Sequence, residues 1–276
     1  MTICWWSGGV TSAVACMLAL EMFEEQNCRI IFMDTGNEDP DTYRFKADCE
    51  KWYEKKIETI TEIGRDYSSI QDVWRKHKTL NTANGATCSS KLKAELRKKW
   101  QKENSYDFQV FGFEFEPKEF NRARAMYLDH AIAKPIFPLL MFGYNKLKCF
   151  DILKTNGIEI PNMYKLGFQN NNCFKTGCVQ AGIGYWQKMK RDFPGKFNTM
   201  ADLEHELTDA HGKQVTILKD QSEEAKTKMK TTKYSNLVFL KKHPNYENKS
   251  IDEMSARDLE SLVDCNGFCG LNELNK

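Results

Sequence analysis

The sequence predicts an α/β protein built around a parallel β-sheet. Apolar runs at residues 3–6, 29–33 and 57–60 have the length of buried strands, and the segments 10–25 and 41–55 between them have helical periodicity. Strands that alternate with helices form parallel sheets joined by right-handed crossovers. A polar turn follows each of the first two apolar runs, where ligands bind in such sheets. The pattern therefore predicts both the fold class and the edge of the sheet that carries the site.

The same alternation continues through the next part of the chain. Residues 68–77 and 89–103 are predicted helices, residues 108–113 a strand, and residues 117–129 a further helix. We expect the loops that begin at Ser7, Asp34 and Gly112 to share one pocket, because each follows a predicted strand.

The second half of the chain has a different pattern. It begins with an apolar segment between prolines at residues 135–138 and contains a polar glycine-rich stretch at residues 167–184. Helices are predicted at residues 146–156, 185–193 and 199–211, and short strands at residues 215–218 and 237–240. A lysine-rich loop at residues 219–233 lies between these two strands. We expect the lysine-rich loop to be solvated and mobile, with contact to nucleic acid or a phosphorylated partner as the alternative. We place a nucleotide-binding domain at residues 1–140 and a mainly helical C-terminal extension at residues 141–276.

The composition limits the classes of partner and location that we expect for the protein. A net charge of +2 over 276 residues gives no general electrostatic reason to bind nucleic acid or membranes. No apolar stretch approaches the roughly 20 residues of a membrane helix, and the N-terminus has no signal-peptide pattern. We therefore expect a cytoplasmic protein with no membrane partner, in which most of the ten cysteines are reduced.

The turn after the first strand has the features of a phosphate-binding loop. It reads Ser-Gly-Gly-Val-Thr-Ser between an apolar strand and a helix. A helix N-terminus binds anions, because its first amides lack partners and the helix dipole is positive there. The alternative is a purely structural glycine turn. The candidate phosphate-binding residues are Ser7, Gly8, Gly9, Thr11 and Ser12.

Asp34 and Gly36 lie in the loop after the second strand. A carboxylate at this position can hold Mg²⁺ or a ribose hydroxyl, and Gly36 is placed with it among the nucleotide-binding residues. The alternative is an Asx turn that caps the following helix.

Basic residues accompany the two later loops. Lys91 and Lys93 lie near the start of a helix, where cations are unfavourable unless a bound anion offsets them. Arg122 and Arg124 follow the Gly112 loop, and guanidinium groups bind phosphate or sulfate oxygens in a bidentate manner. The alternative for the arginines is an ion pair with Glu116 or Glu119.

Two cysteine pairs have the spacing of metal-binding turns. Each pair encloses a glycine, and four thiolates held by two turns suit tetrahedral zinc or a [4Fe-4S] cluster. Redox-active thiols and unrelated free cysteines are the alternatives. The candidate ligands are Cys173, Cys178, Cys265 and Cys269.

These motifs, in this order, resemble the phosphoadenosine phosphosulfate (PAPS) reductase family of the adenine nucleotide α-hydrolase-like, PP-loop superfamily. The resemblance covers roughly the first 140 residues. A second stretch is similar to an extension in bacterial and phage-encoded members; it runs from Met163-Tyr164-Lys165-Leu166-Gly167 through Asn172-Cys173, Gly177-Cys178-Val179 and Gly184-Tyr185-Trp186. The motifs that carry it are Ser7 to Ser12, Phe32 to Glu38, Cys88-Ser89-Ser90-Lys91-Leu92-Lys93, and Gly112 to Arg124.

The resemblance implies a Rossmann-like, five-stranded parallel sheet that binds ATP or another adenine nucleotide, with Asp34 orienting Mg²⁺. It implies one of two activities. An ATP pyrophosphatase would cleave the α–β bond to adenylate a substrate for sulfur transfer, with Asp34 and Lys91 as catalytic residues. A sulfonucleotide reductase would attack PAPS with Cys269, in a tail that reads Cys-Gly-Leu-Asn.

Partners also follow from the resemblance: a sulfur-donor protein, and tRNA or DNA as acceptor. A third reading, from a different class, is an accessory protein that binds nucleotide or nucleic acid without catalysis. Val10-Thr11 favours it, because many ATP-using members carry an aspartate for magnesium there.

The cysteine motifs generate the first prediction. Protein purified under anaerobic conditions should carry about one equivalent of zinc or one iron–sulfur cluster per chain. Metal analysis and an absorption spectrum measure this directly. Less than about half an equivalent of either metal would exclude a four-cysteine site.

Overall fold

The computed structural model describes residues 1–82 and 85–259. Its centre is a five-stranded sheet in the order β3-β2-β1-β6-β7, with every neighbouring pair parallel. The α/β fold class and the parallel five-stranded sheet are thus confirmed. The strands are β1 (Thr2–Trp6), β2 (Cys28–Met33), β3 (Ile57–Ile60), β6 (Phe108–Val110) and β7 (Pro135–Ile136).

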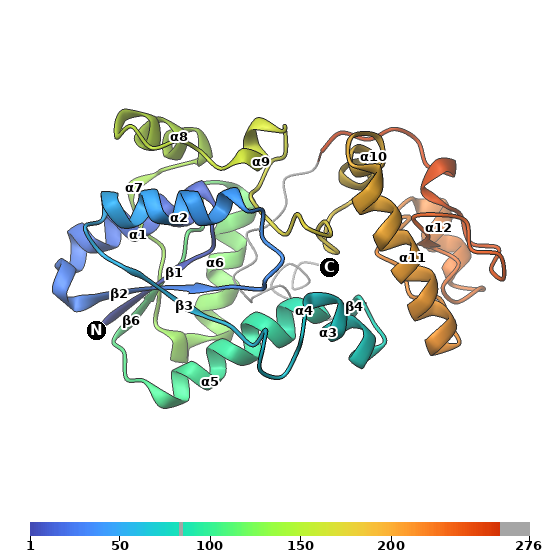
Figure 1. The fold of residues 1–276 in the computed structure, drawn as a ribbon, viewed down its shortest axis with the longest axis horizontal. Coiled ribbons are helices and arrows are strands. Elements are labelled where there is room, and N and C mark those ends of the chain that lie inside the picture. The colour runs from blue at the N-terminus through green and yellow to red at the C-terminus, as the bar shows by residue number, and fades with distance from the viewer. Residues whose placement is uncertain (83–84, 260–276) are drawn as a thin grey trace.

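Helices cover both faces of the sheet (Figure 1). On one face lie α1 (Val10–Phe23) and α2 (Asp41–Trp52), with α7 (Pro138–Phe142) and α8 (Lys146–Thr155) packed outside α1. On the other face lie α5 (Glu95–Glu103) and α6 (Pro117–Asp129). The sheet is therefore buried on both sides, as parallel sheets usually are.

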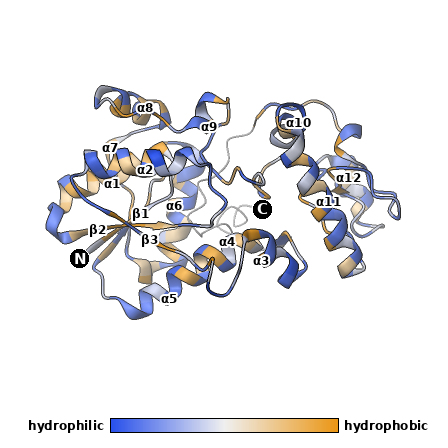
Figure 2. Ribbon diagram, viewed as in Figure 1, coloured by the Kyte–Doolittle hydropathy of each residue, from blue (hydrophilic) through white to orange (hydrophobic). Residues whose placement is uncertain are grey.

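The alternation of side chains along β1 sorts the core into two layers. Cys4 and Trp6 pack with α1 and α2, whereas Ile3 and Trp5 pack with α5 and α6. Figure 2 shows that the strands and most of α1 are hydrophobic. A helix that is apolar on all sides must be covered on all sides, and α1 lies between the sheet and α8.

The strand order fixes where a ligand can bind. The chain moves outward from β1 to β2 and β3, then returns to place β6 on the other side of β1. The loops after β1 and β6 therefore leave the sheet in opposite directions, which opens a crevice at their carboxyl ends. The Ser7 and Gly112 loops begin at this switch point.

The C-terminal region is mainly helical, as expected. Its helices share a third apolar core with the segment between β3 and α5. The boundary at residue 140 stays a prediction. The elements of these two segments are α3 (Ile70–His77), β4 (Asn81–Thr82), β5 (Gly85–Ala86), α4 (Thr87–Ser89), α9 (Asn162–Lys165), α10 (Ile183–Asp192), α11 (Pro194–His211), β8 (Leu218–Lys219), α12 (Glu223–Met229) and β9 (Leu237–Val238).

Two predictions for this region were wrong in detail. The lysine-rich segment contains a helix, α12, capped by the Ser222 side chain, which accepts a hydrogen bond from the Ala225 amide. The first turn of α12 contains Glu223 and Glu224, and its last turn contains two lysines. These charges interact favourably with the helix dipole. The helix predicted from residue 199 begins at Pro194, because proline suits the first helical turn.

No described helix is long and apolar enough to cross a bilayer.

A buried carboxylate fastens α11 to the strands beside it. Glu204 is fully buried, and its two oxygens accept hydrogen bonds from the amides of Ile217 and Leu240, each at 2.7 Å. Burial raises the pKa of Glu204 from its ordinary 4.5 to about 8, although the two amides favour the charged form. The folded protein therefore holds this proton more tightly than the unfolded chain does.

This shift predicts a pH-dependent stability. The raised pKa of Glu204 contributes to the free energy of unfolding. This contribution is fully present below pH 4.5 and is lost as the pH rises to about 8. At pH 5 the variant Glu204→Gln should be less stable by about 1–3 kcal/mol, since its amide nitrogen cannot accept a hydrogen bond. The difference should shrink by pH 8 in urea unfolding. Glu224→Gln, an exposed change on α12, is the control; a difference that grew with pH would contradict the shift.

Candidate functional site

The loop after β1 is closed by its own hydroxyl groups. The Ser12 hydroxyl accepts a hydrogen bond from the Ser7 amide at 3.0 Å and donates one to the Gly9 carbonyl at 2.9 Å. Gly8 has a φ of +89°, which favours glycine, and a Cβ there would lie 3.0 Å from the Thr42 side chain. The chain therefore enters α1 through a tight turn that only glycine fits well.

The N-terminus of α1 has a composition that suits an anion. Its N-cap is Gly9, in extended conformation and without a side-chain capping hydrogen bond, and its first turn contains no acidic residue. A helix N-terminus attracts anions through its first amides and its dipole, although the Val10 amide already donates to the Tyr164 hydroxyl. Phosphate binding by residues 7–12 stays a prediction, and we use the term phosphate-binding loop for these residues.

Gly112 packs against this loop from the neighbouring strand. A Cβ at Gly112 would lie 2.7 Å from both the backbone nitrogen and the Cα of Ser12, and 2.9 Å from the carbonyl carbon of Thr11. Backbone touches backbone there, so no other residue fits without displacing α1. The loops after β1 and β6 therefore touch each other. One pocket shared by the Ser7, Asp34 and Gly112 loops stays a prediction, since neither Asp34 nor Gly112 lines the cavity at Ser7.

A narrow cavity opens at the phosphate-binding loop. Its volume is about 20 Å³, which is room for about one water molecule. Ser7 and Lys93 line it, and Lys93 is 4% exposed. The charged and thiol side chains in its wall are Glu38, Lys93, Cys88, Cys173 and Cys178.

Two buried polar atoms in the cavity wall lack partners among the described residues. They are the Oδ1 atom of Asn171 and the indole Nε1 of Trp74, one an acceptor and the other a donor. Such a group costs about 1–3 kcal/mol when it is left without a hydrogen bond.

A family model for the phosphoadenosine phosphosulfate reductase domain matches residues 2–180. The chain belongs to the PAPS reductase family. No curated protein matches it. The match includes the phosphate-binding loop and Gly112, and it continues past residue 140 through the segment that contains Cys173 and Cys178.

Two solved structures are similar to the chain. PAPS reductase from Candida auris, in a phosphate complex, is 16% identical over 63% of this chain and 81% of that chain, with a TM-score of 0.46. The U34-tRNA thiolase NcsA from Methanococcus maripaludis, with its [4Fe-4S] cluster, is 14% identical over 75% of this chain and 71% of that chain, with a TM-score of 0.34.

Cys173 and Cys178 line the cavity from a loop that is anchored by Asn37. The Asn37 carbonyl accepts hydrogen bonds from the amides of Phe174 and Lys175, at 3.0 and 3.2 Å, and the Asn37 side chain donates to Thr176 at 2.8 Å. Cys173 and Cys178 are thereby held against the loop that follows β2. Cys265 and Cys269 lie outside the described residues.

Within residues 1–82 and 85–259, no group of three cysteine, histidine or acidic side chains is arranged to hold a metal ion. The zinc or [4Fe-4S] site therefore stays a prediction. The soft thiols of Cys173 and Cys178 fit either metal chemically. Cys88, which our sequence analysis did not consider as a thiol, lines the same cavity. Its position could have been suspected, because it directly precedes the predicted basic helix.

Asp34 forms an Asx turn, but this turn does not cap the following helix as the alternative had it, because the N-cap of α2 is Pro40. Its Oδ1 accepts a hydrogen bond from the Gly36 amide at 2.7 Å, and the Tyr43 hydroxyl donates to Oδ2 at 2.9 Å. Burial and the Asp34 carboxylate raise the pKa of Tyr43. Gly36 has a φ of +68°, which this turn requires. The carboxylate is half-exposed, and its role in holding Mg²⁺ stays a prediction.

The two predicted lysines have different surroundings. Lys91 donates to the Glu95 carboxylate at 2.6 Å, and this hydrogen bond raises the pKa of Lys91. Lys93 lies in the cavity wall instead. Residues 90–94 form a π-helical turn between α4 and α5, which widens the helix at this point. Only Lys93 is placed beside the phosphate-binding loop.

The two predicted arginines do not act together. Arg122 is buried and donates to Glu119 at 2.6 Å, with its guanidinium 4.3 Å from the centre of the Phe113 ring. Arg124 is exposed, because residues two apart on a helix face different directions. The alternative of an ion pair with Glu119 therefore holds for Arg122, although this pair is buried.

The loop after β6 contains two acidic residues, Glu114 and Glu116, and the negative charge of Glu114 is neutralised by an ion pair. The Glu114 carboxylate accepts a hydrogen bond from the Lys146 backbone amide at 3.0 Å and forms an ion pair with the Lys146 ammonium at 3.2 Å. It thus serves as an acidic partner for the first turn of α8. Glu116 is exposed and does not extend into the cavity wall.

The segment after α8 also contacts the phosphate-binding loop. The family resemblance included this segment from Met163 onward, but we predicted none of its residues before Cys173 as part of the site. The Asn171 side chain donates to the Gly8 carbonyl at 2.8 Å and to the Thr42 hydroxyl at 3.0 Å. The Tyr164 hydroxyl accepts a hydrogen bond from the Val10 amide at 3.3 Å. The run of three asparagines before Cys173 was the available signal, because buried amide side chains need partners.

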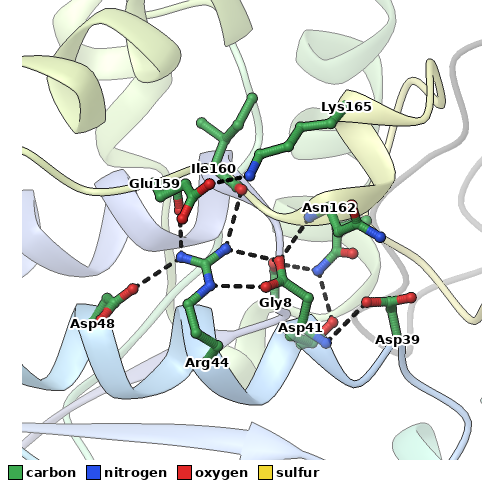
Figure 3. Close-up of polar contacts among 11 residues, drawn as sticks. Gly8, Asp39, Asp41, Arg44, Asp48, Glu159, Ile160, Asn162 and Lys165 are labelled. Carbon is green, nitrogen blue, oxygen red and sulfur yellow. Dashed lines mark hydrogen bonds and ion pairs between the residues drawn. The ribbon is translucent and has the colours of Figure 1, made fainter.

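Arg44 holds this segment in place (Figure 3). Its five N–H groups donate to the Asp41 and Asp48 carboxylates and to the carbonyls of Glu159 and Ile160, at 2.7–3.1 Å. The Asp41 carboxylate also accepts a hydrogen bond from the Asn162 amide at 2.7 Å. Arg44 and this amide lower the pKa of Asp41 despite its partial burial.

The contact at Gly112 predicts a specific loss. Gly112→Ala should displace the first turn of α1, weaken binding of inorganic pyrophosphate by about tenfold or more, and destabilise the fold by about 1–3 kcal/mol. Isothermal titration calorimetry and thermal melts measure the two effects. Gly195→Ala is the matched control, because a Cβ at Gly195 meets nothing within 4 Å. Equal pyrophosphate affinity in the two variants would refute the proposed contact.

Proposed function

We propose that the protein is an adenine-nucleotide enzyme that cleaves the α–β bond of ATP to adenylate an acceptor for sulfur transfer. One observation carries this proposal: the phosphate-binding loop, a buried lysine and three thiols line the same cavity. The thiols are Cys88, Cys173 and Cys178. Nucleotide phosphates and sulfur chemistry would therefore meet at one place.

The roles of the residues follow from their positions. The α1 amides would bind the phosphates, and the Lys93 ammonium would balance the charge that develops as pyrophosphate leaves. An acceptor oxygen attacks the α-phosphorus, the bond to the bridging oxygen breaks, and pyrophosphate departs. A sulfur nucleophile then displaces AMP. Asp34 would hold Mg²⁺, which would supply charge neutralisation at the phosphates.

The cysteines would supply the sulfur chemistry. Together with Cys265 and Cys269, Cys173 and Cys178 would hold zinc or a [4Fe-4S] cluster beside the nucleotide. A sulfur-donor protein and a tRNA or DNA acceptor are the partners that we infer. We place the protein in the cytoplasm, since the eight described cysteines are free thiols.

Reduction of PAPS is the second candidate. The ion pair between Glu114 and Lys146 favours it, because this pair removes the negative charge that would otherwise repel a highly anionic substrate. Cys269 would then be the nucleophile that attacks the sulfate sulfur, and Cys269 could not at the same time be a permanent metal ligand.

Product analysis under anaerobic conditions separates the functions. AMP and pyrophosphate formed from ATP support adenylation. Sulfite released from PAPS, and lost in Cys269→Ser at unchanged metal content, supports reduction. Nucleotide binding without turnover of either compound would point to a non-catalytic accessory protein.

Two lysine variants, one in the cavity wall and one on the surface, test the proposed role of the cavity. Lys93→Met should raise the Kd for ATP by about tenfold and lower turnover by about 100-fold, because one charge contact to the reacting phosphates is lost. Lys102→Met, at an exposed position on α5, is the control and should behave like wild type. Calorimetry gives the Kd and pyrophosphate release gives turnover. Equal ATP affinity in both variants would exclude Lys93 from the phosphate site.

A further inference from the structure

A second cavity lies outside the phosphate site, between α8 and the segment 157–169. Its volume is about 640 Å³, within the range of pockets that bind small molecules. It shares no lining residue with the cavity at the phosphate-binding loop. Nothing in the proposed reaction uses it.

Apolar side chains, three of them aromatic, form much of its wall. Phe150, Tyr164 and Phe168 line it together with Ile158 and Ile160. The rings of Phe150 and Tyr164 meet edge to face, with centroids 5.1 Å apart, so their orientation is fixed by each other. Aromatic walls of this kind stack well on an aromatic ligand.

Of the lysines that line the cavity, Lys154 forms no ion pair among residues 1–82 and 85–259. Lys146 is paired with Glu114, and Glu159 is paired with Lys165. Lys154 also lines the cavity, is exposed, and forms no ion pair with any residue that the structure describes. A ligand that matches this wall therefore carries one negative charge near Lys154.

We propose that this cavity binds an aromatic monoanion, with its ring against Phe150 and Tyr164 and its anionic group beside Lys154. The ligand is of one to three rings, since the cavity holds a molecule of that size.

Tyr164 connects this cavity to the phosphate-binding loop. Its ring forms part of the cavity wall, while its hydroxyl accepts a hydrogen bond from the Val10 amide at 3.3 Å. A ligand that shifts the ring alters this hydrogen bond, and with it the availability of the Val10 N–H to a phosphate at the N-terminus of α1. The two sites are then coupled, and the coupling is reciprocal. This coupling rests on the proposed nucleotide site, whereas binding in the cavity does not.

The fluorescent monoanion 8-anilinonaphthalene-1-sulfonate tests the binding. It should bind the folded protein saturably, at one site, and Phe150→Ala should raise its Kd at least about fivefold. Lys154→Glu, an exposed change that spares the fold, should raise it at least about threefold. Lys148→Glu, on the same helix but outside the cavity, should leave it unchanged. Phenylacetate should compete, and uncharged phenylacetamide should not. Equal Kd values in wild type, Phe150→Ala and Lys154→Glu would overturn the site.

ATP tests the coupling. Saturating ATP should change the Kd of the probe at least about twofold in wild type and leave it unchanged in Tyr164→Phe, which keeps the ring and removes the hydroxyl. ATP that binds without altering the Kd of the probe would overturn the coupling alone. Absence of ATP binding would overturn the proposed function and leave the cavity site standing.

Discussion

The five hydrogen bonds of Arg44 are the contact on which the candidate site depends. An arginine has five N–H donors, and here each has an acceptor on α2 or on the segment that follows α8. This fixes the start of α9 against α2, and α9 in turn presents Tyr164 to the phosphate-binding loop. Without that anchor, the loop would lose a partner that comes from more than 150 positions further along the chain.

The charged side chains after β6 and those that line the cavity have different surroundings. On the β6 side, Arg122 pairs with Glu119 and Glu114 pairs with Lys146, so these groups are neutralised in place. At the cavity itself, buried Lys93 and Glu38 line the same wall, beside the N-terminus of α1. The proposed nucleotide site therefore has one lysine and no arginine among the described residues that line this cavity.

The sequence was informative where local chemistry determines the structure. The alternation of apolar runs gave the sheet, and the glycines at positions 8 and 112 marked the loops that meet at its switch point. Burial and pairing were harder to predict. The pair between Arg122 and Glu119 is local, three residues apart on α6, and the sequence already offered it as the alternative. The burial of Lys93 in the cavity beside Ser7 depends on the tertiary fold instead. Asn171 and Cys88 were missed for the same reason, because their neighbours are distant in the chain.

The packing of α8 on α1 has a consequence for dividing the molecule. A fragment that ended at residue 140 would retain every strand of the sheet, yet the face of α1 that Cys149 and Leu153 cover would meet water. The Arg44 guanidinium would lose two carbonyl acceptors in the same fragment. The unit that can be expressed by itself is therefore larger than the sheet and its flanking helices, and it reaches at least to Asn171.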